Sequence, residues 1–167
     1  MEPIIISASR ATDIPTFYSD WLISRVEEGY LKWKNPFNGK YQDVSFTKTR
    51  LFVFWSKNPF PMLKKLPYFD EKGYNYYFQF TVNDYEQEKW EKNLPALNKR
   101  LETFIELSEL IGKQKVIWRF DPLIISDKLH PDELLKRIEK IGDQLFPYTH
   151  RLVISFIDIE IYQKVKR

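Results

Sequence analysis

The sequence of 167 residues contains no cysteine. Without thiol groups the chain can form no disulfide, and it can supply no catalytic thiolate, zinc-thiolate site or cysteine ligand for an iron–sulfur cluster. Histidine is almost absent too, since His130 and His150 are the only two. We therefore predict no metal site and no cofactor bound by this chain alone.

Long hydrophobic runs and a strong excess of charge are also missing. No window approaches the roughly 20 apolar residues that a membrane helix needs, and the chain does not open with a basic region followed by a long apolar run. Lys and Arg number 26 against 23 Asp and Glu, a net charge of +3 that is too small to indicate nucleic-acid binding by itself. We expect a cytoplasmic protein without a membrane partner.

The common catalytic motifs do not occur either. The sequence contains no G-x-G-x-x-G, G-x-x-x-x-G-K-[ST], G-x-S-x-G or H-E-x-x-H, so the standard signatures of dinucleotide-binding enzymes, P-loop proteins, α/β-hydrolases and zinc proteases are absent. Aromatic residues are abundant instead, at 17% of the chain. We predict that most of them fill the core of a single α/β domain covering residues 1–167.

Apolar runs alternate with amphipathic segments along the chain. The order is βαβαβαβαβ, with a long excursion over 30–48 that leaves room for a short hairpin. This order predicts a parallel sheet with right-handed crossovers, either a partial (βα)8 TIM-like barrel of about five strands or an open doubly wound sheet. The expected strands are 4–6, 51–55, 74–83, 116–120 and 152–158, and the expected helices are 16–28, 62–66, 97–111 and 131–145.

Polar residues follow each expected strand. The carboxyl ends of parallel strands share one rim, where α/β proteins bind ligands, so these side chains should converge there. Three of them are cations, which suits a small anionic ligand such as a phosphate or a carboxylate. The predicted ligand-binding residues are Ser9, Arg10, Lys57, Asn58, Gln79 and Arg119, and the predicted catalytic carboxylates are Asp13, Asp121 and Asp158.

Several of these residues also have a purely structural interpretation. Arg119 and Asp121 could equally form an ion pair that stabilises the sheet. Lys57 and Asn58 precede Pro59, where an extended polar turn is favoured. Ser9 could equally be a helix cap or a turn residue.

Six ordered motifs together resemble a known family. They are IISASRATDIP at 5–15, NPFN at 35–38, FWSKNP at 54–59, YYFQFT at 76–81, VIWRFDP at 116–122 and ISFID at 154–158. They are similar to an uncharacterised bacterial family known as domain of unknown function eighteen forty-eight. Its longer members carry a C-terminal cysteine cluster that resembles that of radical S-adenosylmethionine proteins, and this resemblance favours the barrel.

The present sequence departs from that pattern, because it ends after the fifth strand and has no cysteine. We therefore expect either a truncated or split member, completed by another polypeptide or associating with itself, or a minimal member without the cluster. Three functions follow as hypotheses: the substrate-binding part of a cluster-dependent enzyme, a module that stacks single-stranded nucleic acid on aromatics such as Tyr74, Tyr76, Tyr77 and Trp33, or a cofactor-free acid–base enzyme using Asp121 and Asp158.

Overall fold

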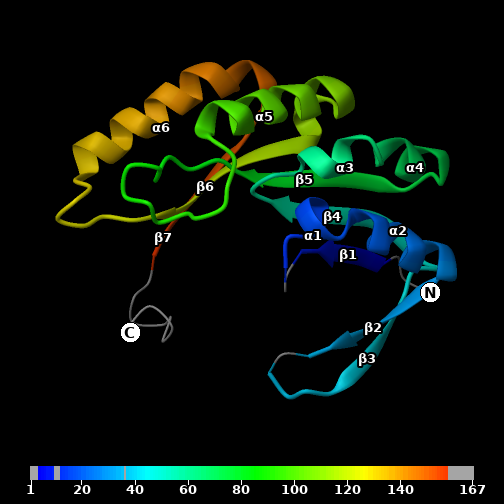
Figure 1. The fold of residues 1–167 in the computed structure, drawn as a ribbon. Helices are drawn as coiled ribbons and strands as arrows, with labels where there is room; N and C mark the ends of the chain where they lie inside the picture. Colours follow the sequence, from blue (N-terminus) through cyan, green and yellow to red (C-terminus); the bar gives the residue numbers. More distant parts are fainter. Residues whose placement is uncertain (1–3, 10–11, 36, 158–167) are drawn as a thin grey trace. The chain divides into compact units, whose positions relative to one another are not determined.

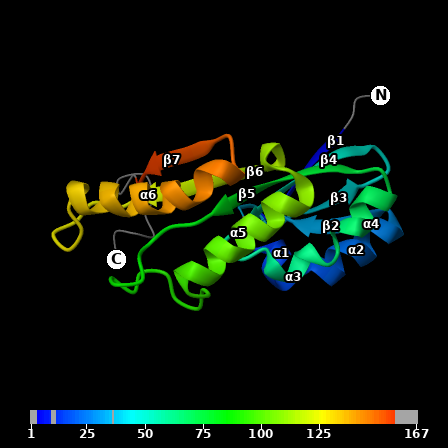
Figure 2. The ribbon, with the colours of Figure 1, turned by 90° about the horizontal axis from the view of Figure 1, so that it is seen from above.

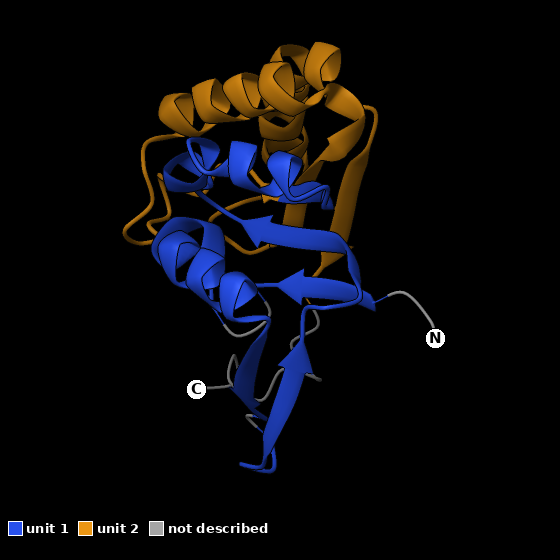
Figure 3. Ribbon diagram, turned by 90° about the vertical axis from the view of Figure 1, so that its right-hand side faces the viewer, with its two compact units in different colours: residues 1–79 blue, residues 80–167 orange. Residues whose placement is uncertain are grey.

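A computed structural model of the chain describes residues 4–9, 12–35 and 37–157 (Figure 1). The chain divides into two compact units, unit 1 over Met1–Gln79 and unit 2 over Phe80–Arg167 (Figure 3). Arg10 and Asp158 lie outside the described residues, so the predictions made for them stay predictions.

Five parallel strands form the sheet, in the order β1-β4-β5-β6-β7. The parallel register aligns Ile6 with Phe52 in unit 1 and Arg119 with Val153 in unit 2. The alternation of helices with these parallel strands confirms the predicted α/β fold. The described strands do not close into a barrel, which is consistent with both the partial barrel and the open sheet. The strands are β1 (Ile4–Ala8), β4 (Thr49–Ser56), β5 (Asn75–Thr81), β6 (Val116–Leu123) and β7 (Leu152–Phe156).

Each of the two helices that the sequence pattern predicts in unit 1 is a pair of helices in the structure. The helix expected over 16–28 is two helices, because Tyr18 has φ −137° and ψ 27° and interrupts the helical backbone. The helix expected over 62–66 is likewise a pair, in which Pro61 and Pro67 each lie in a first turn, as their missing N–H groups require. The four helices are α1 (Ile14–Phe17), α2 (Ser19–Glu28), α3 (Phe60–Leu63) and α4 (Leu66–Glu71).

The excursion between the first two parallel strands contains the expected hairpin. Strands β2 (Tyr30–Lys34) and β3 (Tyr41–Ser45) pair in antiparallel register, from Tyr30 opposite Ser45 to Lys34 opposite Tyr41. The turn is closed by the Gly39 N–H, which donates to the Asn35 carbonyl at 2.8 Å.

Aromatic side chains form the core of unit 1, as predicted. Phe52, Phe54, Phe69 and Phe78 are fully buried. The rings of Phe52 and Phe54 stack 5.9 Å apart, and Phe69 meets both edge-on at 5.3 and 5.6 Å. Edge-to-face and offset contacts of this kind add stability beyond the burial of apolar area.

Unit 2 contains the two long helices, α5 (Leu97–Ile111) and α6 (Pro131–Leu145), both with the bounds that the sequence predicts. Short 3-10 turns, η1 (Lys113–Lys115) and η2 (Phe146–Tyr148), precede β6 and β7. Both long helices lie on the same side of β6 and β7 (Figures 1 and 2). Within the described part of the chain, no helix is long and apolar enough to cross a membrane.

Candidate ligand-binding site at the strand ends

In unit 1, the Asp13 carboxylate joins the loops that follow β1 and β4. Its Oδ1 accepts from the Thr16 N–H at 3.0 Å, which caps α1. Its Oδ2 accepts from the Ser56 hydroxyl and from the Lys57 N–H, both at 2.9 Å. These bonds give Asp13 a positioning role, and its catalytic role stays a prediction.

Lys57 and Asn58 contribute backbone groups to the same network. The Thr16 hydroxyl donates to the Asn58 carbonyl at 2.8 Å, and the Asn58 N–H donates to the Ser56 hydroxyl oxygen at 3.0 Å. The loop after β4 is therefore held by hydrogen bonds of its backbone groups, and the ligand-binding roles of the Lys57 and Asn58 side chains stay predictions. Ser9 donates its hydroxyl to the carbonyl of Ala8, next to it in the chain.

In unit 2, three of the polar side chains at the strand ends meet. The guanidinium of Arg119 pairs with the carboxylate of Asp121, and the hydroxyl of Ser155 donates to the other oxygen of that carboxylate. Arg119 and Asp121 belong to β6 and Ser155 to β7. The side chains of Arg119 and Asp121 are 13% and 23% exposed, so both are partly accessible to solvent. We call these three residues the Arg119 cluster.

The Arg119 cluster lies on the face of β6 that the helices do not cover. Trp118 and Phe120, which alternate with Arg119, are buried. The Trp118 ring lies 3.6 Å from the point where a Cβ on Gly142 of α6 would stand, so this face is the one under α6. Side chains alternate between the two faces of a strand, so Arg119 and Asp121 point the opposite way.

A buried side-chain amide holds the backbone of Asp121. Asn83 is fully buried, just beyond β5, and its Oδ1 accepts from the Asp121 N–H at 3.0 Å. Its Nδ2 donates to the Asp121 carbonyl at 3.2 Å and to Glu91 at 3.3 Å. The sequence pattern predicts a longer strand, over 74–83, that includes both Gln79 and Asn83. In the structure β5 ends at Thr81, and Gln79 is half-buried within it.

Tyr85 supports the next residue along β6. Its hydroxyl donates to the Pro122 carbonyl at 2.6 Å and accepts from the Ile124 N–H at 3.2 Å. Burial raises the pKa of Tyr85 to about 12, so the phenol stays a hydrogen-bond donor at neutral pH. The peptide bond between Asp121 and Pro122, one residue before the carbonyl that Tyr85 contacts, is cis.

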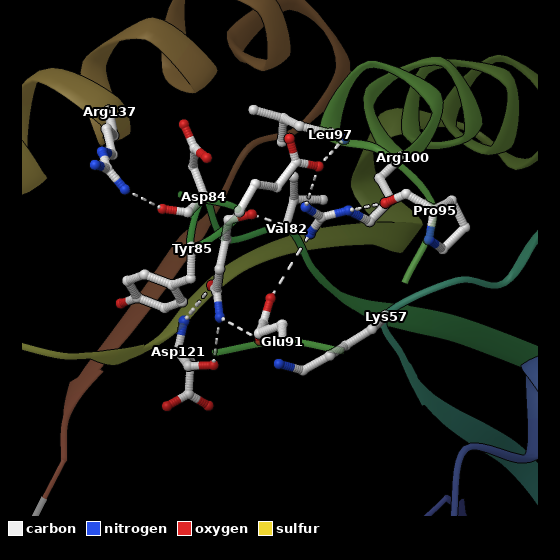
Figure 4. Close-up of polar contacts among 12 residues, drawn as sticks. Lys57, Val82, Asp84, Tyr85, Glu91, Pro95, Leu97, Arg100, Asp121 and Arg137 are labelled. Atoms are coloured by element: carbon white, nitrogen blue, oxygen red, sulfur yellow. Dashed lines mark hydrogen bonds and ion pairs between the residues drawn. The ribbon is translucent and has the colours of Figure 1, made fainter. Parts of the chain in front are cut away.

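Two buried arginines hold the loop from Val82 to Ala96 that carries Asn83. Arg100 of α5 is 2% exposed and donates to the carbonyls of Asn83 and Pro95 at 2.9 and 3.0 Å. Arg137 of α6 donates to both oxygens of Glu88, at 2.9 and 3.0 Å, and to the Asp84 carbonyl at 2.9 Å. Figure 4 shows Arg100 and Arg137 approaching the loop from their two helices.

The ion pair between Arg137 and Glu88 shifts the pKa values of both groups. Hydrogen bonding from Arg137 holds the pKa of Glu88 below its ordinary value of 4.5, and Glu88 in turn raises the pKa of Arg137. Sequence reasoning missed both arginines. Their signal was their position, because each interrupts the apolar stripe of its helix, where a charged residue needs a buried partner.

No group of three metal-ligating side chains gathers among the residues that the structure describes. Comparison with curated proteins found no match, and comparison with solved structures found none. A family model does match, over residues 5–167, which is nearly the whole chain. The chain therefore belongs to the family described as domain of unknown function (DUF1848).

Proposed function

We propose that this chain is a ligand-binding domain that holds a small anionic ligand at the Arg119 cluster. The observation that carries the proposal is the partly exposed side chain of Arg119 on the sheet face opposite α6, with its guanidinium oriented by Asp121. A guanidinium in a fixed orientation suits a carboxylate or a phosphate because it can donate two parallel hydrogen bonds.

The neighbours of Arg119 narrow the class of ligand. Asp121 is an acceptor on the same face, so it favours a ligand that also presents a hydroxyl group. Ser155 can donate to or accept from such a ligand. A small hydroxylated anion, such as a hydroxy acid or a sugar phosphate, matches this set of donors and acceptors.

The wider role proposed is the substrate-binding part of a cluster-dependent, radical-type enzyme. Iron–sulfur clusters are held by cysteine thiolates, and this chain has no cysteine. The residues present therefore do not fit a cluster, and we derive no chemical step through one. In this proposal the redox centre belongs to a second polypeptide, and the chain described here binds and orients the substrate.

The two other hypotheses have less support. Tyr76, one of the proposed stacking residues, is 2% exposed and donates its hydroxyl to Asp70 at 2.9 Å, so it cannot stack on a base. Asp121 accepts hydrogen bonds from Arg119 and Ser155, which favours an orienting role over proton donation.

Titration calorimetry with a panel of phosphate, sulfate, small hydroxy acids and sugar phosphates tests the proposal. We expect at least one hydroxylated anion to bind, and we expect Arg119→Gln to weaken it at least tenfold. Arg151→Gln is the matched control, because Arg151 is an exposed arginine of the same unit outside the cluster. Equal affinity in the parent and in Arg119→Gln would refute the assignment.

A further inference from the structure

One face of β7 is apolar and uncovered among the described residues. Leu152, Ile154 and Phe156 are 43%, 51% and 68% exposed. The register aligns Leu152 with Trp118 and Ile154 with Phe120. These apolar side chains therefore share the face on which α6 covers β6, and Figure 2 shows β7 beside α6 with no helix drawn over it.

A groove of about 400 Å³ runs beside this face, and it lies wholly within unit 2. Its floor includes Trp118 and Leu152, and one wall is the flank of α6 that carries Glu139 and Asp143. These two residues are one helical turn apart, exposed, and form no ion pair with a described residue. His150 and Arg151 lie at the end of the groove where β7 begins.

The charges around the groove indicate which charges a complementary partner would carry. An acidic wall along α6 is complementary to lysines or arginines on the flank of a neighbouring element. The basic end at His150 and Arg151 is complementary to the C-terminus of a helix, which carries a partial negative charge. A helix lying parallel to α6 satisfies both conditions, since α6 itself ends close to the start of β7.

We infer that this groove binds an amphipathic helix of a partner polypeptide. The apolar stripe of that helix covers Leu152, Ile154 and Phe156, its basic flank faces Glu139 and Asp143, and its C-terminus lies at His150 and Arg151. The interaction is independent of the Arg119 cluster, which lies on the opposite face of β6. The groove is thus the proposed binding position for a partner such as the second polypeptide of the proposed function.

Fluorescence anisotropy with the full chain tests the inference. The probe is an 18-residue peptide with an N-terminal fluorescein, leucines at helical spacing, lysines along one flank and a free C-terminal carboxylate. A second peptide is identical except that glutamates replace the lysines. We expect the lysine peptide to bind at least tenfold more tightly than the glutamate peptide.

Variants locate the binding surface. Ile154→Asp should weaken the lysine peptide at least tenfold, whereas Leu110→Asp should not, because Leu110 is a similarly exposed apolar residue on α5. The double variant Glu139→Lys and Asp143→Lys should reverse the preference and bind the glutamate peptide more tightly. This charge reversal tests the inference even if Ile154→Asp does not fold, because Glu139 and Asp143 are exposed helix positions where lysine is tolerated.

Three results would overturn the inference. The first is no saturable binding of the lysine peptide, and the second is an unchanged preference in the charge-reversed variant. The third is a dimer of the parent, seen by sedimentation velocity and abolished by Ile154→Asp, since a second copy of this chain would then occupy the groove.

Discussion

Arg137 shows how a single charged residue can hold a loop from within the buried stripe of a helix. It is 6% exposed, and its side chain donates to Glu88, Glu133, Gln87 and the Asp84 carbonyl. A buried ion pair adds little compared with well-packed apolar residues, but removing one partner leaves an uncompensated buried charge.

Arg137→Met should lower the free energy of unfolding by about 3–5 kcal/mol, because Glu88 would keep its charge with no partner in a nearly buried position. Urea denaturation followed by circular dichroism measures this change. Lys136→Met is the control, since Lys136 is an exposed neighbour on the same helix and its loss should cost less than about 0.5 kcal/mol. A cost below about 1 kcal/mol for Arg137→Met would contradict this account.

The same pair makes stability depend on pH in a defined direction. The pKa of Glu88 is lower in the folded chain than its ordinary value of 4.5, so the unfolded state binds more protons in this range. The contribution of Glu88 is complete above about pH 5 and is lost as the pH falls through the folded pKa. Glu88→Gln should be less stable at neutral pH and should lose less stability on acidification.

Denaturation midpoints between pH 7 and pH 3 measure this effect. Glu139→Gln should follow the parent curve, because Glu139 is exposed and pairs with no described cation. If the stability of Glu88→Gln fell as steeply with acid as that of the parent, the pair would not be the source of the pH dependence.

At the scale of elements, Gly29 determines where α2 ends and β2 begins. Its φ is 81°, in the left-handed region that side chains disfavour, and its N–H donates to the Val26 carbonyl at 3.1 Å. Its own carbonyl accepts from the Phe46 N–H at 2.8 Å. The glycine thus reverses the chain after α2 and anchors the end of the hairpin.

Gly29→Ala should destabilise the protein by about 1 kcal/mol, because a Cβ there meets no other atom within 4 Å and the cost is conformational only. Gly142→Ala should change stability in the opposite direction, by about 0.5–1 kcal/mol. Gly142 lies inside α6 without a positive φ, and a Cβ would meet Trp118 at an ordinary contact distance of 3.6 Å. Thermal unfolding of the two variants compares the signs, and equal signs would contradict the prediction.

The sequence predicts best those elements whose bounds are set by neighbouring residues in the chain. Helices α5 and α6 have the predicted bounds because a long apolar period and terminal glycine or proline residues define them. The break at Tyr18 was not predicted. It separates α2 from the short helix α1, which is capped by the Asp13 carboxylate, and that carboxylate also accepts a hydrogen bond from Ser56 of β4. A sequence period carries no information about such a contact between distant residues.

At the scale of the whole molecule, the order of βα units predicts the parallel sheet, since right-handed crossovers leave few arrangements. The polar rim was predicted in part. Arg119 and Asp121 share a face by the alternation of one strand, which the sequence shows. The supporting residues Arg100 and Arg137 were missed, and Asn83 was expected inside a strand. All three act through the non-periodic loop over 82–96, whose path depends on tertiary contacts.

The sheet has β1 at one end of its strand order, next to β4 alone. Edge strands of this kind tend to pair with other chains unless charges protect them. Strand β1 carries no charged residue and exposes Ile5, which is 64% accessible. A cavity of about 320 Å³, lined by Trp21, Trp33 and residues of β1 and the hairpin, lies beside it.

Ile5→Lys should therefore reduce concentration-dependent self-association without unfolding the chain, because a charge on an edge strand opposes pairing with a second chain. Sedimentation velocity over a hundredfold range of protein concentration measures the effect. Leu135→Lys is the matched control, since Leu135 is 62% exposed but lies on helix α6 rather than on a strand. If the edge of β1 causes association, Ile5→Lys should reduce it and Leu135→Lys should leave it unchanged. Equal reductions in both variants would show that general surface hydrophobicity, rather than the open edge of β1, brings the chains together.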